Sequence, residues 1–246
     1  IENCLFGVDI NPKSVQICQL RLWTELLKST YYKTPEDLET LPNLDTNIRV
    51  GNSLVSMIDV QVGKTLEDTD SDIKALVANY KRIVSEYKIQ PDKALKRKVK
   101  EEIQNIRESF KKLSYGQGSV DLQDAVSTED HFENAFEWMI EFPETLSDEG
   151  VFQGFDCILA NPPYMRVQGL VKADNRAKLY YDNHYKVAVG SYDLANLFIE
   201  RAMKLSAPTG YNSFIFPHKF LNSANGTVLR TYLKQSRNVH SIVHFG

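Results

Sequence analysis

The chain has 246 residues, of which 42% are hydrophobic, 25% charged and 11% aromatic. This balance is typical of a folded globular protein with a sizeable core and excludes a disordered or fibrous chain. No run reaches the roughly 18 apolar residues that a membrane helix needs, and the residues near Ile1 do not resemble a signal peptide. The composition therefore predicts a cytoplasmic protein. A formal net charge of −3 argues against a surface that grips nucleic acid over its whole extent.

The three cysteines indicate neither a disulfide framework nor a metal site. Cys4, Cys18 and Cys157 are odd in number, far apart in the chain and without Cys-x-x-Cys spacing or histidine partners. Free cysteine behaves as a small apolar residue and is commonly buried. We therefore expect all three to be packing residues.

Strand and helix signals alternate from the start of the chain. The apolar run 4–10 predicts a strand, and the helical pattern that follows begins with Asn11 as N-cap and Pro12 as first helical residue. A second strand is predicted at 48–50, followed by a turn at 51–53.

Residues 60–149 are predicted to be a helical insertion, because their composition becomes charged and helix-forming. Apolar residues at helical spacing predict two amphipathic helices packed as a hairpin. These residues are Leu76, Tyr80, Ile83, Val84, Tyr87, Leu95, Val99, Ile103, Ile106, Phe110 and Leu113. The second helix is rich in Lys and Arg, but acidic residues are mixed among them, which favours a solvated face over a phosphate-binding one.

The catalytic core is then predicted to consist of residues 1–59 and 150–246. Within the second part, the sequence predicts a strand at 155–160, a loop up to Gly190, a helix at 193–205, a turn at 208–210, a strand at 211–216, a helix at 228–233 and a strand at 239–245. Strands that alternate with helices predict a doubly wound, mostly parallel α/β sheet.

Polar residues close three of the apolar runs. Asp9 ends the first run, Asn52 and Ser53 follow the second, and Asn161 follows the third. Ligands of parallel α/β sheets bind beyond the carboxyl ends of the strands, so these positions are candidate site residues.

The tetrapeptide Asn161-Pro162-Pro163-Tyr164 carries the most specific chemistry. An adenine amino group has two N–H donors, which the Asn161 amide oxygen and the Pro162 carbonyl could accept while the nitrogen lone pair attacks a methyl donor. Two prolines fix the backbone and bring no competing N–H, and the Tyr164 ring could stack on an extruded base for about 1–3 kcal/mol. The alternative is a tight turn after a strand. Four such residues directly after an apolar run are rare, which favours the catalytic interpretation.

These features together resemble the amino-directed adenine DNA methyltransferases, especially those fused to or paired with restriction nucleases in type II (IIG-like) systems. The segments that carry the resemblance are Leu5–Pro12, Gly51–Leu54, Phe142–Glu144, Phe155-Asp156, Asn161–Tyr164, Tyr192–Leu194, Phe198–Glu200, Phe214–Pro217, Lys219–Leu221 and Ile242–Gly246. Their order along the chain is more specific than any single segment.

The resemblance implies a Rossmann-like methyltransferase fold, S-adenosylmethionine as cofactor and double-stranded DNA as substrate, in a bacterial restriction-modification enzyme. It places Asp9 and the neighbouring Ile10 at the cofactor, with Asp9 on the ribose hydroxyls. Asn52 stands where the family usually has Asp, so its bond to the cofactor's adenine would be weaker, and Ser53 would assist. Asp193 would begin the helix behind the cofactor pocket; its alternative role is an N-cap.

The chain also departs from the family. The Gly-rich cofactor loop would precede Ile1, and the target-recognition domain would follow Gly246, so we expect a truncated fragment with little activity of its own. The segment 165–189 is predicted to be a lid over DNA. Two alternatives stay open: a methyltransferase that acts on RNA or on protein glutamine, since these share similar tetrapeptides, and a non-catalytic assembly module of a restriction complex.

Overall fold

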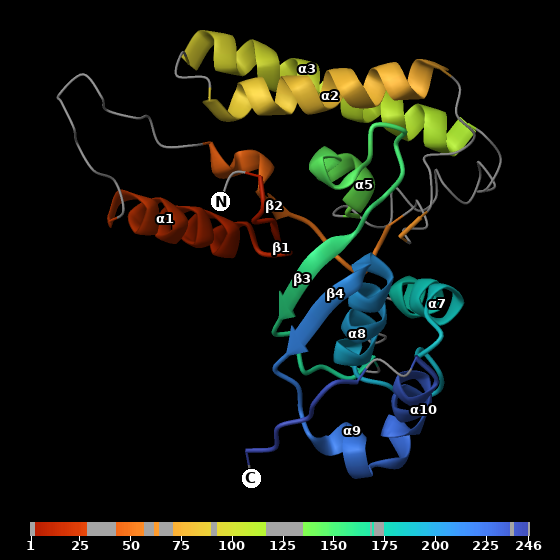
Figure 1. Cartoon of the computed structure of the whole chain (residues 1–246). Coiled ribbons are helices and arrows are strands. Elements are labelled where there is room, and N and C mark those ends of the chain that lie inside the picture. The colour runs from red at the N-terminus through yellow and green to blue at the C-terminus, as the bar shows by residue number, and fades with distance from the viewer. Residues whose placement is uncertain are drawn as a thin grey trace. The chain divides into compact units, whose positions relative to one another are not determined.

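The computed structural model describes residues 3–28, 43–56, 62–63, 71–89, 93–116, 135–167, 169, 175–236 and 239–245. The chain divides into two compact units, residues 1–153 and residues 154–246. Each unit holds a two-stranded parallel sheet with helices (Figure 1). The fold class is therefore mixed α/β with small parallel sheets.

The first unit contains β1 (Gly7–Asp9), α1 (Pro12–Lys28), η1 (Leu44–Thr46), β2 (Ile48–Val50), α2 (Ser71–Ile89), α3 (Lys93–Gly116), α5 (Trp138–Glu141) and η2 (Pro143–Thr145). The second unit contains β3 (Phe155–Ala160), α7 (Asn175–His184), α8 (Leu194–Leu205), β4 (Ser206–Phe214), α9 (Lys219–Asn222), η3 (Ala224–Gly226) and α10 (Thr227–Ser236).

In the first unit, α1 connects the parallel strands β1 and β2. The Asn11 side-chain oxygen accepts the Lys13 N–H at 2.9 Å, which confirms the predicted N-cap. The same helix is tied to β2 by Gln19, whose Nε2 donates to the Ile48 carbonyl at 3.1 Å. Such a crossover is what parallel strands require, because a short hairpin cannot join them.

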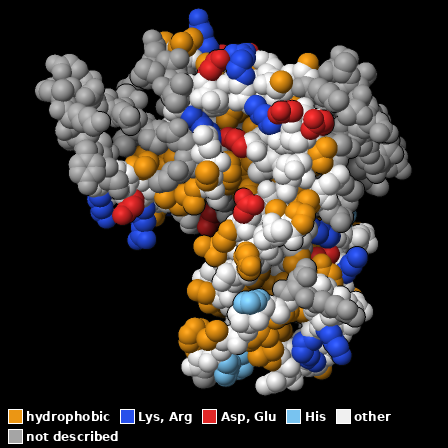
Figure 2. All heavy atoms as spheres, viewed as in Figure 1, with side chains coloured by type: hydrophobic (Ala, Val, Ile, Leu, Met, Phe, Trp, Pro, Cys, Tyr) orange, Lys and Arg blue, Asp and Glu red, His pale blue; other side chains and the backbone are white. Residues whose placement is uncertain are grey.

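The two long helices α2 and α3 pack against each other, as the apolar spacing predicts (Figure 1). Their buried side chains are Val77, Tyr80, Ile83, Val84, Tyr87, Ile103 and Ile106. Leu95 is 46% exposed, so it does not join them. The side chains of Leu76, Phe110 and Leu113 lie outside the described residues. On α3, Arg97 pairs with Glu101 in solvent at 3.4 Å, and Figure 2 shows cationic and anionic side chains interspersed over these helices.

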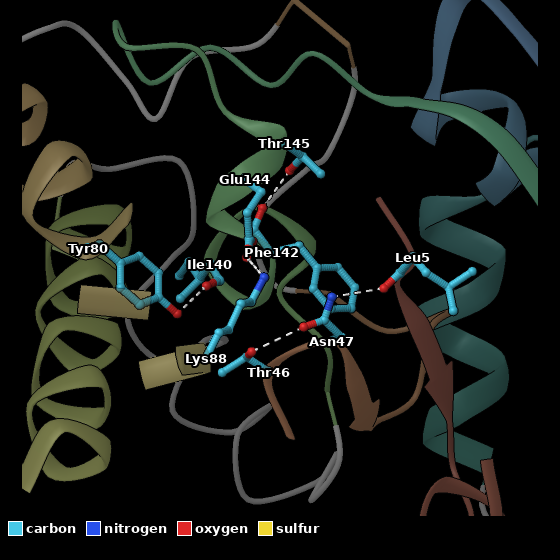
Figure 3. Close-up of polar contacts among 9 residues, drawn as sticks. All are labelled: Leu5, Thr46, Asn47, Tyr80, Lys88, Ile140, Phe142, Glu144 and Thr145. Carbon is cyan, nitrogen blue, oxygen red and sulfur yellow. Dashed lines mark hydrogen bonds and ion pairs between the residues drawn. The ribbon is translucent and has the colours of Figure 1, made fainter. Parts of the chain in front are cut away.

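The end of α2 is fixed by buried polar contacts (Figure 3). The Lys88 side chain is 3% exposed, and its Nζ lies 2.5 Å from Glu144 Oε1. Earlier in the same helix, the Tyr80 hydroxyl donates to the Ile140 carbonyl at 2.7 Å. Phe142, between those two partners, is fully buried. These contacts attach α2 to the Phe142–Glu144 segment, which carries part of the resemblance and lies within the same predicted insertion.

In the second unit, β3 and β4 run parallel with Ala160 opposite Phe214. The register shifts between Phe155 and Cys157, and a Cβ on Gly210 would lie 2.7 Å from the Phe155 carbonyl oxygen. The turn predicted at 208–210 is therefore wrong, because these residues lie within β4 at this irregularity. The helix predicted at 193–205 is confirmed as the largely buried α8, and the one predicted at 228–233 as α10.

Three further predictions are wrong. Residues 239–245 form no strand within the described structure. Residues 175–184, expected in a loop, form the helix α7, whose apolar side is built from the buried rings of Tyr180 and Tyr181. Cys4, Cys18 and Cys157 are all exposed, so they are not packing residues.

Replacing Lys88 with methionine should destabilise the fold by about 3 kcal/mol, because Glu144 would keep a largely buried charge without its partner. Urea unfolding of the two proteins measures this difference. The matched control is Lys28→Met, whose pair with Glu25 is exposed on both sides and should cost at most about 1 kcal/mol. Equal losses in the two variants would contradict the buried-pair account.

Candidate functional site

The carboxyl end of the β1–β2 sheet presents Asp9 beside the turn that follows β2. Asp9 pairs with Val50 in the register, and the Gly51 N–H donates to the Asp9 carbonyl at 3.0 Å. The Asp9 side chain is exposed, and its Oδ1 accepts the Asn11 N–H at 2.7 Å. In the described part of the chain no other group bonds this carboxylate, so Oδ2 is available to a ligand. The next residue, Ile10, is 59% exposed.

Asn52 and Ser53 form the turn itself, and both are half-buried. The Asn52 side-chain oxygen accepts the Leu54 N–H at 3.1 Å, so part of its acceptor capacity serves the turn. Its second lone pair can still accept a bond from a ligand. The Ser53 carbonyl accepts the Trp138 indole N–H at 3.3 Å, which holds the turn against the first residue of α5.

An aromatic cluster supports this turn, and two of its members were not predicted as site residues. Gly51 lies against Phe136, whose ring centroid is 5.0 Å from that of Trp138 and 5.4 Å from that of Phe142. The Phe136 N–H also donates to the Val55 carbonyl at 2.8 Å. The available signal was a pair of aromatic residues two positions apart, shortly before Phe142.

The carboxyl end of β3 carries the tetrapeptide 161–164. The Ile215 N–H donates to the Ala160 carbonyl at 3.2 Å, so the residues that follow β3 and β4 lie side by side. Asn161 is exposed and Pro162 is buried, which anchors the backbone while the amide stays accessible. Tyr164 is 53% exposed, and its hydroxyl lies 2.8 Å from Asn161 Oδ1. Among the described residues, no backbone N–H occupies the Pro162 carbonyl.

The chain just after the tetrapeptide pairs with the start of α8. The Val167 N–H donates to the Tyr192 carbonyl at 3.0 Å, and the Leu194 N–H donates to the Met165 carbonyl at 2.8 Å. Asp193 sits between these bonds at the N-cap position, but its side chain makes no capping hydrogen bond. Its half-buried carboxylate is therefore not used by the helix, contrary to the N-cap alternative.

The predicted lid is anchored at the end of α7. Val187 donates its N–H to Glu200 Oε2 at 3.0 Å, and the Tyr185 hydroxyl accepts a bond from Arg201 Nε at 3.0 Å. Burial raises the pKa of Tyr185 well above its ordinary value, so the phenol stays neutral. Residues 168 and 170–174 of the predicted lid lie outside the described residues, and the role of the segment as a lid over DNA stays a prediction.

Each sheet thus presents hydrogen-bond acceptors at the carboxyl ends of parallel strands, the geometry of a ligand-binding α/β protein. The predicted residues Asp9, Asn52 and Ser53 come together in the first unit. In the second unit, the residues directly after the tetrapeptide 161–164 pair with those around Asp193. None of the described helices is long and apolar enough to cross a membrane.

Comparison with known families identifies the chain. The model of the Eco57I restriction-modification methylase family matches residues 3–246, so the chain belongs to this family. The resemblance found in the sequence is thereby confirmed. No solved structure is significantly similar to the chain.

The curated relatives are distant and much longer. The type II restriction enzyme and methyltransferase RM.Eco57I of Escherichia coli is 24% identical over 245 residues, which cover 99% of this chain and 17% of that protein. The protein RM.MjaORFECS2P of Methanocaldococcus jannaschii is 26% identical over 290 residues, 95% of this chain and 23% of the relative. The type II methyltransferase M.AccI of Acinetobacter calcoaceticus is 28% identical over 120 residues, 46% of this chain and 22% of the relative. The chain therefore spans about a fifth of the length of these relatives.

Gly51→Ala should destabilise the protein by about 1–3 kcal/mol, because the new Cβ would lie 2.4 Å from Phe136 Cδ2 in a buried position. Thermal or urea unfolding measures the loss. Gly169→Ala is the matched control, since a Cβ there meets nothing within 4 Å. If the two variants unfold alike, the close contact between the turn and the aromatic cluster is not a packing constraint.

Proposed function

We propose that this chain is the catalytic part of a site-specific DNA methyltransferase that transfers a methyl group from S-adenosylmethionine to the N6 amino group of a flipped-out adenine. The observation that carries the proposal is the exposed Asn161 amide beside the exposed Tyr164 ring, directly after a parallel strand. Membership in a restriction-modification methylase family supports DNA as the substrate.

The first unit offers side chains that suit the ribose and the adenine of the cofactor. Asp9 offers an exposed carboxylate oxygen that suits the ribose hydroxyls, with Ile10 beside it. Asn52 and Ser53 would contact the adenine ring of the cofactor. In the second unit, the Asp193 carboxylate makes no capping hydrogen bond to α8 and could bind a ligand. When bound, S-adenosylmethionine supplies an activated methyl group on sulfur. The parallel β1–β2 and β3–β4 pairs are consistent with a Rossmann-like, doubly wound sheet, which is the fold we propose.

The residues 161–164 would align the target nitrogen. The Asn161 side-chain oxygen and the Pro162 carbonyl would accept its two hydrogens, which directs the lone pair toward the methyl group for in-line displacement. Most of the acceleration would come from this alignment and from acceptors that stabilise the positive charge developing on nitrogen. The exposed Tyr164 ring would hold the extruded base by stacking. Double-stranded DNA, a target-recognition domain and a restriction nuclease are the partners that this proposal implies.

Asn161→Ala should lower kcat about a hundredfold or more, while affinity for S-adenosylmethionine changes little, because the lost acceptor acts on the transition state. The measurement uses the complete gene product, labelled S-adenosylmethionine and unmethylated bacterial DNA. Asn105→Ala, which changes an exposed asparagine on α3, is the control and should behave as wild type.

The contrasting variant is Asp9→Ala, which should weaken cofactor binding about tenfold to a hundredfold by removing charge-assisted hydrogen bonds. Asp148→Ala removes a carboxylate that is 96% exposed and should leave affinity unchanged. If Asn161→Ala and Asp9→Ala lowered only the stability and left kcat and cofactor affinity unchanged, the roles assigned to these two residues would be wrong. Label that enters RNA or protein instead of DNA would favour the other methyltransferase classes, and no cofactor binding would favour an assembly module.

A further inference from the structure

The Tyr164 hydroxyl joins the ends of two neighbouring strands. It lies 2.8 Å from Asn161 Oδ1, just after β3, and 3.0 Å from the carbonyl oxygen of Ile215, just after β4. The Ile215 N–H in turn donates to Ala160. Asn161 and Tyr164 are both exposed, so burial does not hold either side chain in place. Within the described residues, this hydroxyl is the one side-chain partner of the Asn161 amide.

The single proton of the Tyr164 hydroxyl limits which hydrogen bonds it can form at the same time. A phenol carries one proton and can also accept, whereas the Ile215 carbonyl can only accept. The hydroxyl therefore cannot donate to both Asn161 Oδ1 and Ile215 at once. If it donates to Ile215, a half-turn of the Asn161 amide lets Nδ2 donate to the phenol oxygen, which completes two hydrogen bonds and turns Oδ1 away from Tyr164.

Both arrangements restrain the Asn161 amide, and the second leaves its oxygen free to accept from a ligand. An acceptor contributes most to catalysis when it is already oriented before the reaction. The phenol is held at its hydroxyl end, and 53% of the residue remains exposed. The ring can therefore stack on a base while its hydroxyl is bonded to the protein.

We propose that the Tyr164 hydroxyl is a positioning group that orients the Asn161 amide through the Ile215 carbonyl, a role separate from stacking by its ring. This inference rests on the proposed methyl transfer for its kinetic consequence. The contact itself exists in the protein without substrate and is measurable there.

The kinetic test is Tyr164→Phe, which keeps the ring and removes the hydroxyl. We expect kcat for methyl transfer by the complete gene product to fall about three- to tenfold, the size of one neutral hydrogen bond, with KM for cofactor and DNA within about twofold. Tyr211→Phe is the matched control, because Tyr211 lies on β4, is 71% exposed and should give wild-type rates. An unchanged kcat in Tyr164→Phe overturns the proposal.

A double-mutant cycle separates positioning from other effects of the hydroxyl. If the hydroxyl acts through Asn161, Tyr164→Phe should cost little in the Asn161→Ala background, and the two losses should not add. Fully additive losses would overturn the proposal, since the hydroxyl would then act independently of the amide.

The substrate-free test is the mobility of the Asn161 side-chain amide, from nitrogen-15 relaxation of its NH2 group. We expect an ordered amide in the wild type and a more mobile one in Tyr164→Phe, with Tyr211→Phe unchanged. Equal order in all three overturns the proposal. If the wild type transfers no methyl group to adenine, the proposed function fails, and this relaxation measurement still decides whether Tyr164 orients Asn161.

Discussion

Parallel strand pairing is the constraint on which the candidate residues of each unit depend. In a parallel pair, the carboxyl ends of both strands lie at the same edge, so whatever follows one strand lies beside whatever follows the other. The Gly51 N–H bond to the Asp9 carbonyl enforces this in the first unit, and the Ile215 N–H bond to the Ala160 carbonyl enforces it in the second. Carboxylate and amide acceptors become neighbours at these edges although they are distant in sequence.

β1 and β2 have three residues each, so packing around the strands helps to preserve the register. In the first unit, an aromatic cluster that includes Phe136 and Phe142 lies under the turn after β2, and the Lys88–Glu144 pair fixes α2 to the same segment. In the second unit, the buried helix α8 supports β3 and β4 and holds the end of α7 through Glu200. A buried charge destabilises the fold unless it is paired, so these contacts require the two partners to lie in the correct positions.

The sequence was sufficient to predict the features that depend on residues close together in the chain. The N-cap at Asn11, the strand ends at Asp9 and Asn161 and the apolar spacing of the helical hairpin are local signals, and the structure contains all of them. The features that the sequence did not predict correctly depend on contacts with residues far away in the chain. Residues 239–245 have strand-forming composition, but a strand needs a neighbour to pair with. The sequence does not reveal the helix α7 because its buried side chains are tyrosines in a polar sequence. The contacts of Phe136 and Trp138 include Gly51 and Ser53, which are far away in the sequence.

We propose that the acceptors after β3 serve methyl transfer to the amino group of adenine. The most direct test of this proposal is the chemical identity of the methylated product. DNA from cells that lack other DNA methyltransferases and express the complete gene product would be digested to nucleosides and analysed by mass spectrometry. We expect N6-methyladenine in DNA from cells with the wild type and its loss in Asn161→Ala. Methylated DNA without N6-methyladenine, or equal N6-methyladenine in both proteins, would contradict the proposal.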